Sequence, residues 1–155
     1  MNRRELTAFI NGMTAPVLRR VRGMIGRCIL DMVDDSGGRQ MVQVHLYGGM
    51  ETLTGVERFQ AYGHNAVPPA GAEGIFAKLS GSPDHVVVLV MESRDARPKG
   101  WQPGESGLYD NLGQLVHLTR AGIVIDGAGL PVTVQNTPSV TIDGDLHVTG
   151  TIDHG

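Results

Sequence analysis

The side chains of this chain that could do metal or nucleophilic chemistry are few and far apart. Its 155 residues include one cysteine and six histidines, which are His45, His64, His85, His117, His147 and His154. No two histidines form a His-x-His or His-x-x-x-His pair, whereas a zinc site needs about four nitrogen or sulfur ligands at local spacing. Cys28 lies in an apolar run, which favours a buried structural thiol over a reactive one. The sequence therefore predicts no zinc site.

The hydroxyl and carboxyl groups offer no catalytic arrangement either. Ser36, Ser80 and Ser82 lack the strand, turn and helix that surround an activated serine. Asp34-Asp35 precedes Ser-Gly-Gly, which is typical of a turn rather than of a catalytic pair of carboxylates. No glycine-rich turn is followed by Lys-Ser/Thr and a helix, as a phosphate-binding loop requires. We therefore expect a protein that is not an enzyme and takes no small-molecule substrate.

Residues 123–155 repeat a five-residue unit that reads apolar, any, apolar, polar, then Gly or Asn. Two of its copies are Ile123-Val124-Ile125-Asp126-Gly127 and Val140-Thr141-Ile142-Asp143-Gly144. From residue 130 onward every aliphatic side chain has an even number. These side chains are Leu130, Val132, Val134, Val140, Ile142, Leu146, Val148 and Ile152. Strict alternation indicates a strand with one apolar face, because successive side chains point to opposite sides.

A single ribbon of this kind has little to pack against and is marginal in water. We expect three copies to bury their even-numbered side chains on a common axis, as an obligate, intertwined homotrimer. The predicted form of residues 123–155 is thus a three-sided β prism, or trimeric β-helix. Because the inward side chains have even numbers, His154 is expected on the inward side, and His147, at an odd position, on the outward side. Three copies of His154 are the single metal candidate that this arrangement offers.

The middle of the chain is predicted to be a small closed barrel over residues 21–95. Apolar alternation and turn residues divide it into five strands. These predicted strands are residues 21–33, 40–47, 53–62, 73–79 and 85–91. An oligonucleotide/oligosaccharide-binding (OB) type of barrel fits this order best, and an SH3-like barrel is the alternative. Residues 96–122 are predicted to be a linker followed by short strands at 106–109 and 114–119.

Residues 1–20 are predicted to be helical. Their apolar side chains recur at spacings of three and four, at Leu6, Ile10, Met13, Val17 and Val21. Gly12 and Pro16 weaken the pattern, so a kink or break is expected near Thr14. Residues 1–30 hold six arginines against Glu5, whereas the remainder is net acidic. This basic segment could contact nucleic acid, phospholipid or an acidic protein, or it could present a solvated face.

The sequence contains no run of about eighteen apolar residues, so no transmembrane helix is predicted. The N-terminus has arginines but lacks the apolar stretch of a secretory signal. We therefore expect the protein to be made in a cytoplasm.

The order of several motifs resembles a known family over nearly the whole chain. The motifs are Met41-Val42-Gln43-Val44-His45-Leu46-Tyr47-Gly48-Gly49, Val56-Glu57-Arg58-Phe59-Gln60-Ala61-Tyr62-Gly63, Pro68-Pro69-Ala70-Gly71-Ala72-Glu73, Pro98-Lys99-Gly100-Trp101-Gln102-Pro103-Gly104-Glu105, Gly107-Leu108-Tyr109-Asp110 and Ile123-Val124-Ile125-Asp126-Gly127. Together they resemble the Mu-type phage baseplate assembly proteins, which form the central tail spike of contractile-tailed phages.

This resemblance implies a homotrimer on the tail axis, with an OB-fold collar at the baseplate hub and a trimeric β-helix as the needle. The implied role is to pierce the host outer membrane when the sheath contracts. The implied partners are hub and tail tube proteins, and the implied location is the baseplate tip of a virion assembled in the host cytoplasm. Family members commonly end in a His-x-His segment that holds iron at the apex. This chain ends Asp153-His154-Gly155, so the resemblance carries over no metal site and no cofactor. The apex is expected to be absent from this chain, or this member is blunt.

Three other interpretations of the sequence compete with this spike. A left-handed β-helix of the acyltransferase kind uses six-residue steps, but only residues 140, 146 and 152 are so spaced, which is too few coils. A lysozyme-bearing spike needs a further domain that this chain lacks. An OB-type nucleic-acid binder with an oligomerising tail stays the alternative. Its stacking side chains would be Tyr47, Phe59, Tyr62 and Phe76, although the barrel segment is net acidic.

Overall fold

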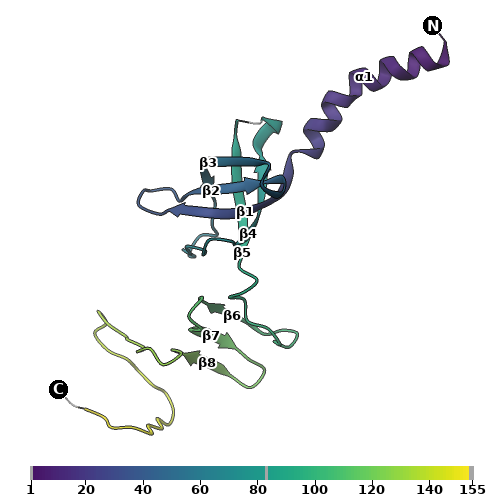
Figure 1. The fold of residues 1–155 in the computed structure, drawn as a ribbon. Helices are drawn as coiled ribbons and strands as arrows, with labels where there is room; N and C mark the ends of the chain where they lie inside the picture. The colour runs from purple at the N-terminus through teal and green to yellow at the C-terminus, as the bar shows by residue number, and fades with distance from the viewer. Residues whose placement is uncertain (1, 83, 154–155) are drawn as a thin grey trace.

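The computed structural model describes residues 2–82 and 84–153. A helix leads into a closed barrel, which is followed by a small sheet and a C-terminal extension (Figure 1). The elements in chain order are α1 (Arg3–Arg22), β1 (Ile25–Asp34), β2 (Met41–Leu46), the 3₁₀ turn η1 (Tyr47–Gly49), β3 (Glu51–Arg58), β4 (Glu73–Lys78), the 3₁₀ turn η2 (Leu79–Gly81), β5 (Val86–Glu92), β6 (Ser106–Tyr109), β7 (Leu115–Leu118) and β8 (Ile123–Asp126). Within the described residues, no helix is long and apolar enough to cross a membrane.

The five strands β1 to β5 close into a barrel in the order β1-β2-β3-β5-β4. Strand β1 pairs with both β2 and β4, so the sheet has no free edge there. The β3–β5 pair is parallel, and the other four pairs are antiparallel. The prediction of a mainly β protein with an N-terminal helix and a five-stranded barrel is confirmed.

Alternating side chains of these strands fill the barrel core. The buried set includes Leu30, Val44, Leu46, Phe76 and Val88. Cross-strand register brings such side chains together, since Leu30 faces Val44 and Phe76 faces Val88. The Phe76 ring is fully buried and meets the Tyr47 ring edge-on, with 5.9 Å between centroids. Apolar burial of this kind is the main term that holds a small barrel together.

Cys28 belongs to the same core, as predicted from its apolar surroundings. Its side chain is buried and forms no disulfide in the described chain. Burial raises the pKa of the Cys28 thiol to about 11, and a hydrogen bond with the Gly74 backbone opposes this shift only in part. The thiolate is therefore scarce at neutral pH, and the group behaves as a small apolar side chain.

The predicted break near Thr14 is wrong, because α1 continues through Pro16 to Arg22. Proline removes one amide donor, and the Gly12 carbonyl that loses its partner lies on an exposed helix where water can reach it. A capping box between Asn2 and Glu5 holds the first turn. Since the helix extends two residues beyond the predicted end, the first strand begins at Ile25 rather than at residue 21.

The third strand was predicted to reach residue 62 but ends at Arg58, because a polar cluster directs the chain into a loop. The Arg58 guanidinium donates to the Gln40 side chain and, at 2.8 Å, to the Ala66 carbonyl. Gln40 is buried and donates to Asp35 and to the same Ala66 carbonyl. Desolvation lowers the pKa of Arg58, opposed by the charge of Asp35. These bonds fasten the loop of residues 59–72 to one end of the barrel.

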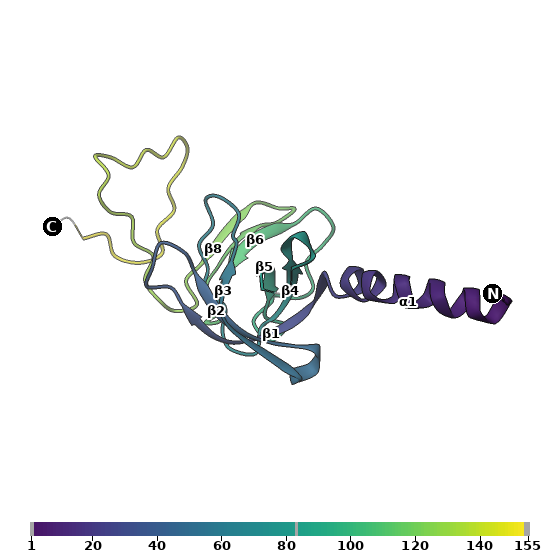
Figure 2. The same ribbon diagram turned by 90° about the horizontal axis from the view of Figure 1, so that it is seen from above.

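The C-terminal part begins with the antiparallel sheet β6-β7-β8. A tight turn follows β8: Ala128 and Gly129 have φ of 51° and 83°, and the Leu130 amide donates to the Gly127 carbonyl at 2.8 Å. From there the described chain to Asp153 contains no helix or strand. It follows a wide open path that stands away from the barrel (Figures 1 and 2). The trimeric prism stays a prediction for this segment.

Candidate oligomerisation surface

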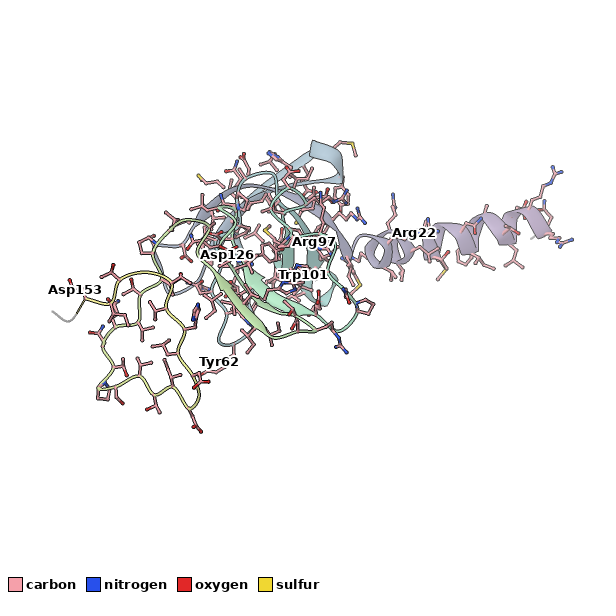
Figure 3. All side chains as sticks on the ribbon, turned by 90° about the horizontal axis from the view of Figure 1, so that it is seen from below. Arg22, Tyr62, Arg97, Trp101, Asp126 and Asp153 are labelled. Carbon is pink, nitrogen blue, oxygen red and sulfur yellow. The ribbon has the colours of Figure 1, made fainter. Side chains whose placement is uncertain are left out.

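The eight side chains predicted to lie on an axis are all exposed in the single chain, at the end of the molecule opposite α1 (Figure 1). Their exposed fractions run from 43 % for Val148 to 69 % for Val134. The structure therefore gathers none of them into a core of their own. Figure 3 shows the extension between the labelled Asp126 and Asp153 as an open ribbon with side chains standing off it. We call residues 130–153 the C-terminal ribbon.

The backbone amides of the described C-terminal ribbon, like its apolar side chains, have few partners within the chain. Among its described residues beyond Leu130, no amide donates to another backbone group of the chain. The Thr137 hydroxyl does donate to the Ser139 carbonyl, which is a local contact. Unpaired amides and carbonyls in an extended chain are the groups that strand pairing satisfies. The ribbon thus offers both an apolar face and a hydrogen-bonding edge.

The ribbon meets the small sheet at an open groove of about 380 Å³. The groove is lined on the sheet side by residues that include Leu108, Val116 and Ile125, and on the ribbon side by Pro131 and Val132. Strand β8 forms one edge of the sheet, and its Ile123 and Ile125 are 71 % and 63 % exposed. Exposed apolar side chains are thus present on both the sheet and the ribbon at this groove.

A cluster that sequence reasoning missed attaches the preceding linker to this sheet. The Trp101 ring stacks on His117 of β7, with centroids 4.2 Å apart and planes inclined by 15°. Glu105 lies beneath, and its Oε2 is 3.4 Å from His117 Nε2, in a geometry that leaves this nitrogen without a well-directed hydrogen bond. The sequence signal that could have revealed this cluster is an aromatic residue, Trp101, within a linker rich in proline and glycine.

The Glu105 carboxylate is held mainly by backbone groups. It accepts hydrogen bonds from the amides of Gln102, at 2.9 Å, and Arg120, at 3.1 Å. These two bonds lower the pKa of Glu105, and the neighbouring His117 adds a smaller effect in the same direction. Because the bonds favour the ionised form, the carboxylate joins the linker to the turn after β7 most firmly when it is charged.

Of the four aromatic side chains predicted for stacking, one is buried in the barrel and three lie beyond the ends of β2 and β3. Phe76 is fully buried and serves the core, and Tyr47, which is 42 % exposed, packs against its edge. Phe59 and Tyr62 are exposed beyond β3, where Tyr62 projects from the loop (Figure 3). Strands β1 to β5 with their connections carry four basic and eight acidic residues. A net negative surface disfavours contact with a phosphate backbone.

The histidines give no metal site in the part of the chain that the structure describes. Across residues 2–82 and 84–153, no three His, Cys, Asp or Glu side chains are grouped so as to hold an ion. His45 contacts Thr52 at 2.9 Å across the barrel sheet, and His117 stacks on Trp101. His154, the predicted metal candidate, lies outside the described residues.

A closed barrel, a small sheet and an exposed repetitive ribbon together define a mainly β protein. The family model described as Bacteriophage Mu Gp45, N-terminal, matches residues 27–95, which is nearly the whole barrel. Baseplate puncturing device gp45 of Escherichia phage Mu is 34 % identical over 146 residues, covering 90 % of this chain and 73 % of that protein. Mu-like prophage FluMu protein gp45 of Haemophilus influenzae is 32 % identical over 153 residues, covering 91 % of this chain and 83 % of that protein.

The chain belongs to the Mu gp45 family of phage baseplate proteins. The resemblance drawn from its motifs is thereby confirmed.

Proposed function

We propose that the chain is the central spike of a contractile phage tail, a homotrimer that pierces the host outer membrane when the sheath contracts. The observation that carries this proposal is the C-terminal ribbon, whose apolar side chains all lie at even positions and are all exposed in the single chain. A relative named as a baseplate puncturing device supports the role. The work of puncture would come from the sheath, so the spike needs no active site.

Three ribbons wound about an axis would bury the apolar side chains that are exposed in one chain and would pair its free backbone groups. Each Val, Ile or Leu contributes about 1.5–3 kcal/mol when it is fully buried. Strand pairing between chains would satisfy the free amides and carbonyls and would close the exposed edges. The odd positions are mostly Thr, Asp, Ser and Gln, which keep the outer face solvated. Axial load would then be shared among hydrogen bonds of all three chains.

The barrel suits the collar of such a spike. Its strand order β1-β2-β3-β5-β4, closed by the parallel β3–β5 pair, is that of an OB-type barrel. The barrel would surround the axis at the baseplate hub, with the β6-β7-β8 sheet as the transition to the needle. Hub and tail tube proteins are the partners that this placement implies, and the tip of the tail is the location.

The experiment that tests the proposal is the solution mass of the full chain by light scattering. With a chain mass of 16.6 kDa, the trimer should weigh about 50 kDa. Val148→Asp would place three carboxylates on the axis and should yield monomers, because unpaired charges are costly to bury. Thr149→Asp adds the same charge one residue along, on the outer face, and should stay trimeric.

Two outcomes would contradict the proposed arrangement. A monomeric parent protein would exclude the prism. A Val148→Asp variant that trimerises as well as Thr149→Asp would show that even positions do not face the axis. Deletion of residues 123–155 completes the test, since the shortened chain should keep a folded barrel and lose most of its tendency to trimerise.

A further inference from the structure

Helix α1 projects from the barrel with no residue buried (Figures 1 and 2). Its direction is fixed by a two-residue connection: the Gly23 amide donates to the Arg19 carbonyl at 3.0 Å, and the Met24 amide to the Val21 carbonyl at 3.3 Å. The Met24 carbonyl in turn accepts from the Lys78 amide of β4 at 2.7 Å. In this structure the connection directs α1 away from its own barrel (Figure 1).

The exposed face of α1 has a defined pattern along its length. Leu6, Ile10, Met13 and Val17 follow at spacings of four, three and four, and their exposed fractions lie between 43 % and 63 %. Arginines flank this line, because Arg3 precedes Ile10 by seven residues and Arg20 follows Met13 by seven, next to the apolar Val21. At 1.5 Å per residue, Arg3 and Arg20 are about 25 Å apart. We call these six residues the α1 seam.

Charge argues against a bundle of α1 helices from several copies of this chain. Helix α1 holds five arginines and one glutamate, a net charge of +4, whereas the rest of the chain has eight basic and fifteen acidic residues, a net charge of −7. Three parallel copies would gather +12 and stack Arg3 and Arg20 in rings within the interface. The charge of Glu5 is already included in this balance, and its carboxylate caps the first turn by accepting from the Asn2 amide at 2.8 Å.

The seam fits a lipid surface no better. Helices that lie on membranes carry their basic residues on the polar face, opposite the apolar one. Three of the five arginines of α1, Arg4, Arg19 and Arg22, lie opposite, but Arg3 and Arg20 lie on the side of the apolar side chains. An apolar stripe with a cation near each end matches a groove with an apolar floor and a carboxylate near each end.

We infer that α1 is a docking helix and that its partner is an acidic groove on another protein of the tail. The apolar floor of that groove takes Leu6, Ile10, Met13 and Val17, and carboxylates about 25 Å apart pair with Arg3 and Arg20. This inference rests on the proposed function, because it is the assembled tail that supplies the partner. Helix α1 and the C-terminal ribbon are then the two attachment points of the chain, one to a different protein and one to its own copies.

The test places the photo-crosslinker p-benzoylphenylalanine at Met13, within the seam, in tail particles that carry the full chain. The same residue at Ala15, on the opposite face of α1, is the matched control. We expect the Met13 probe to crosslink a different polypeptide, at a peptide rich in Asp and Glu, and the Ala15 probe to give less than about a tenth of that yield. Crosslinks that join only copies of this chain, or no crosslink, would overturn the inference.

Charge reversal tests the ends of the seam. Arg3→Glu with Arg20→Glu should lower the amount of Met13 crosslink per tail by about tenfold or more, since each end arginine would face a like charge. Arg4→Glu with Arg22→Glu makes the same change in net charge on the opposite face and should lower it less than about twofold. An equal loss of Met13 crosslink in the two double variants would show that general electrostatic attraction alone holds α1, and would refute the proposed groove.

Two further results separate this inference from the function on which it rests. Tail particles that lack the chain altogether would refute both. Particles that contain a trimer of the chain, with Met13 crosslinked only within that trimer, would support the proposed spike and refute the docking role of α1. Strong binding of the full chain to phosphatidylglycerol vesicles, lost in Arg3→Glu with Arg20→Glu, would assign the seam to lipid instead and overturn the inference.

Discussion

Gly26 lies directly under the ring at the centre of the barrel, and adding one methyl group there should loosen the barrel. In β1, Gly26 faces Phe76 of β4, and a Cβ atom at Gly26 would stand 2.6 Å from Phe76 Cε1 and 2.7 Å from Cζ. The ring is fully buried, so it can move aside only by displacing its neighbours. Overpacking of this size costs about 1–3 kcal/mol. Replacing a strand glycine by alanine returns about 0.5–1 kcal/mol of backbone entropy.

The midpoints of these ranges give a net loss of about 1.2 kcal/mol for Gly26→Ala, or about an eightfold drop in protection. Hydrogen exchange of the β1 and β4 amides measures it, because it reports the opening of the barrel separately from the rest of the chain. Phe76→Leu in the same chain should recover part of the loss, as the added methyl group then occupies vacated space. Gly38→Ala is the control, since no atom lies within 4 Å of a Cβ there. Unchanged protection in Gly26→Ala, or no recovery in the double variant, would refute the packing argument.

Two further predictions concern ionisable groups. Because the pKa of Glu105 is lowered from 4.5 by the Gln102 and Arg120 amides, its stabilisation is complete above pH 4.5 and is lost as the pH falls through the lower folded value. Fluorescence of Trp101, the single tryptophan, should report an acid release of the linker that Glu105→Gln abolishes; an identical acid transition in that variant would contradict the assignment. The buried Cys28 thiol, with its pKa raised to about 11, should not react with a thiol reagent such as DTNB at about pH 8 until the chain is denatured, and rapid reaction of the native protein would show that the barrel is open.

Strands were predictable where their side chains alternate between core and solvent. Leu30 in β1 and Val42, Val44 and Leu46 in β2 follow this rule, and their burial matches it. The helix limits were less predictable, because the cost of Pro16 depends on whether water can reach the carbonyl it leaves free. The early end of β3 was unpredictable for a similar reason, because the sequence near Arg58 does not indicate that its side chain bonds to Gln40 and Ala66.

The contacts around Trp101 lay beyond sequence reasoning because they join residues from three separate segments. Glu105, His117 and Arg120 are distributed over a linker, a strand and a turn, and only the folded sheet brings them together. The ribbon is the opposite case. Its pattern is plain in the sequence, whereas one chain offers no partner on which the even-numbered side chains could pack.

Barrel and ribbon should therefore respond independently to substitution. The barrel closes its own edges, since β1 pairs with both β2 and β4, and its core draws on side chains of its own chain. In the proposed trimer the ribbon draws on other chains, so its stability should depend on protein concentration and that of the barrel should not. Val148→Asp should abolish the trimer and leave the exchange protection of β1 and β4 unchanged, and Gly26→Ala should do the reverse. Sites that share no partners contribute additively, so a double variant should show both losses at their single-variant size. A barrel that unravels when the ribbon is broken would instead place the two parts in one cooperative unit, and the collar would then depend on the needle for its fold.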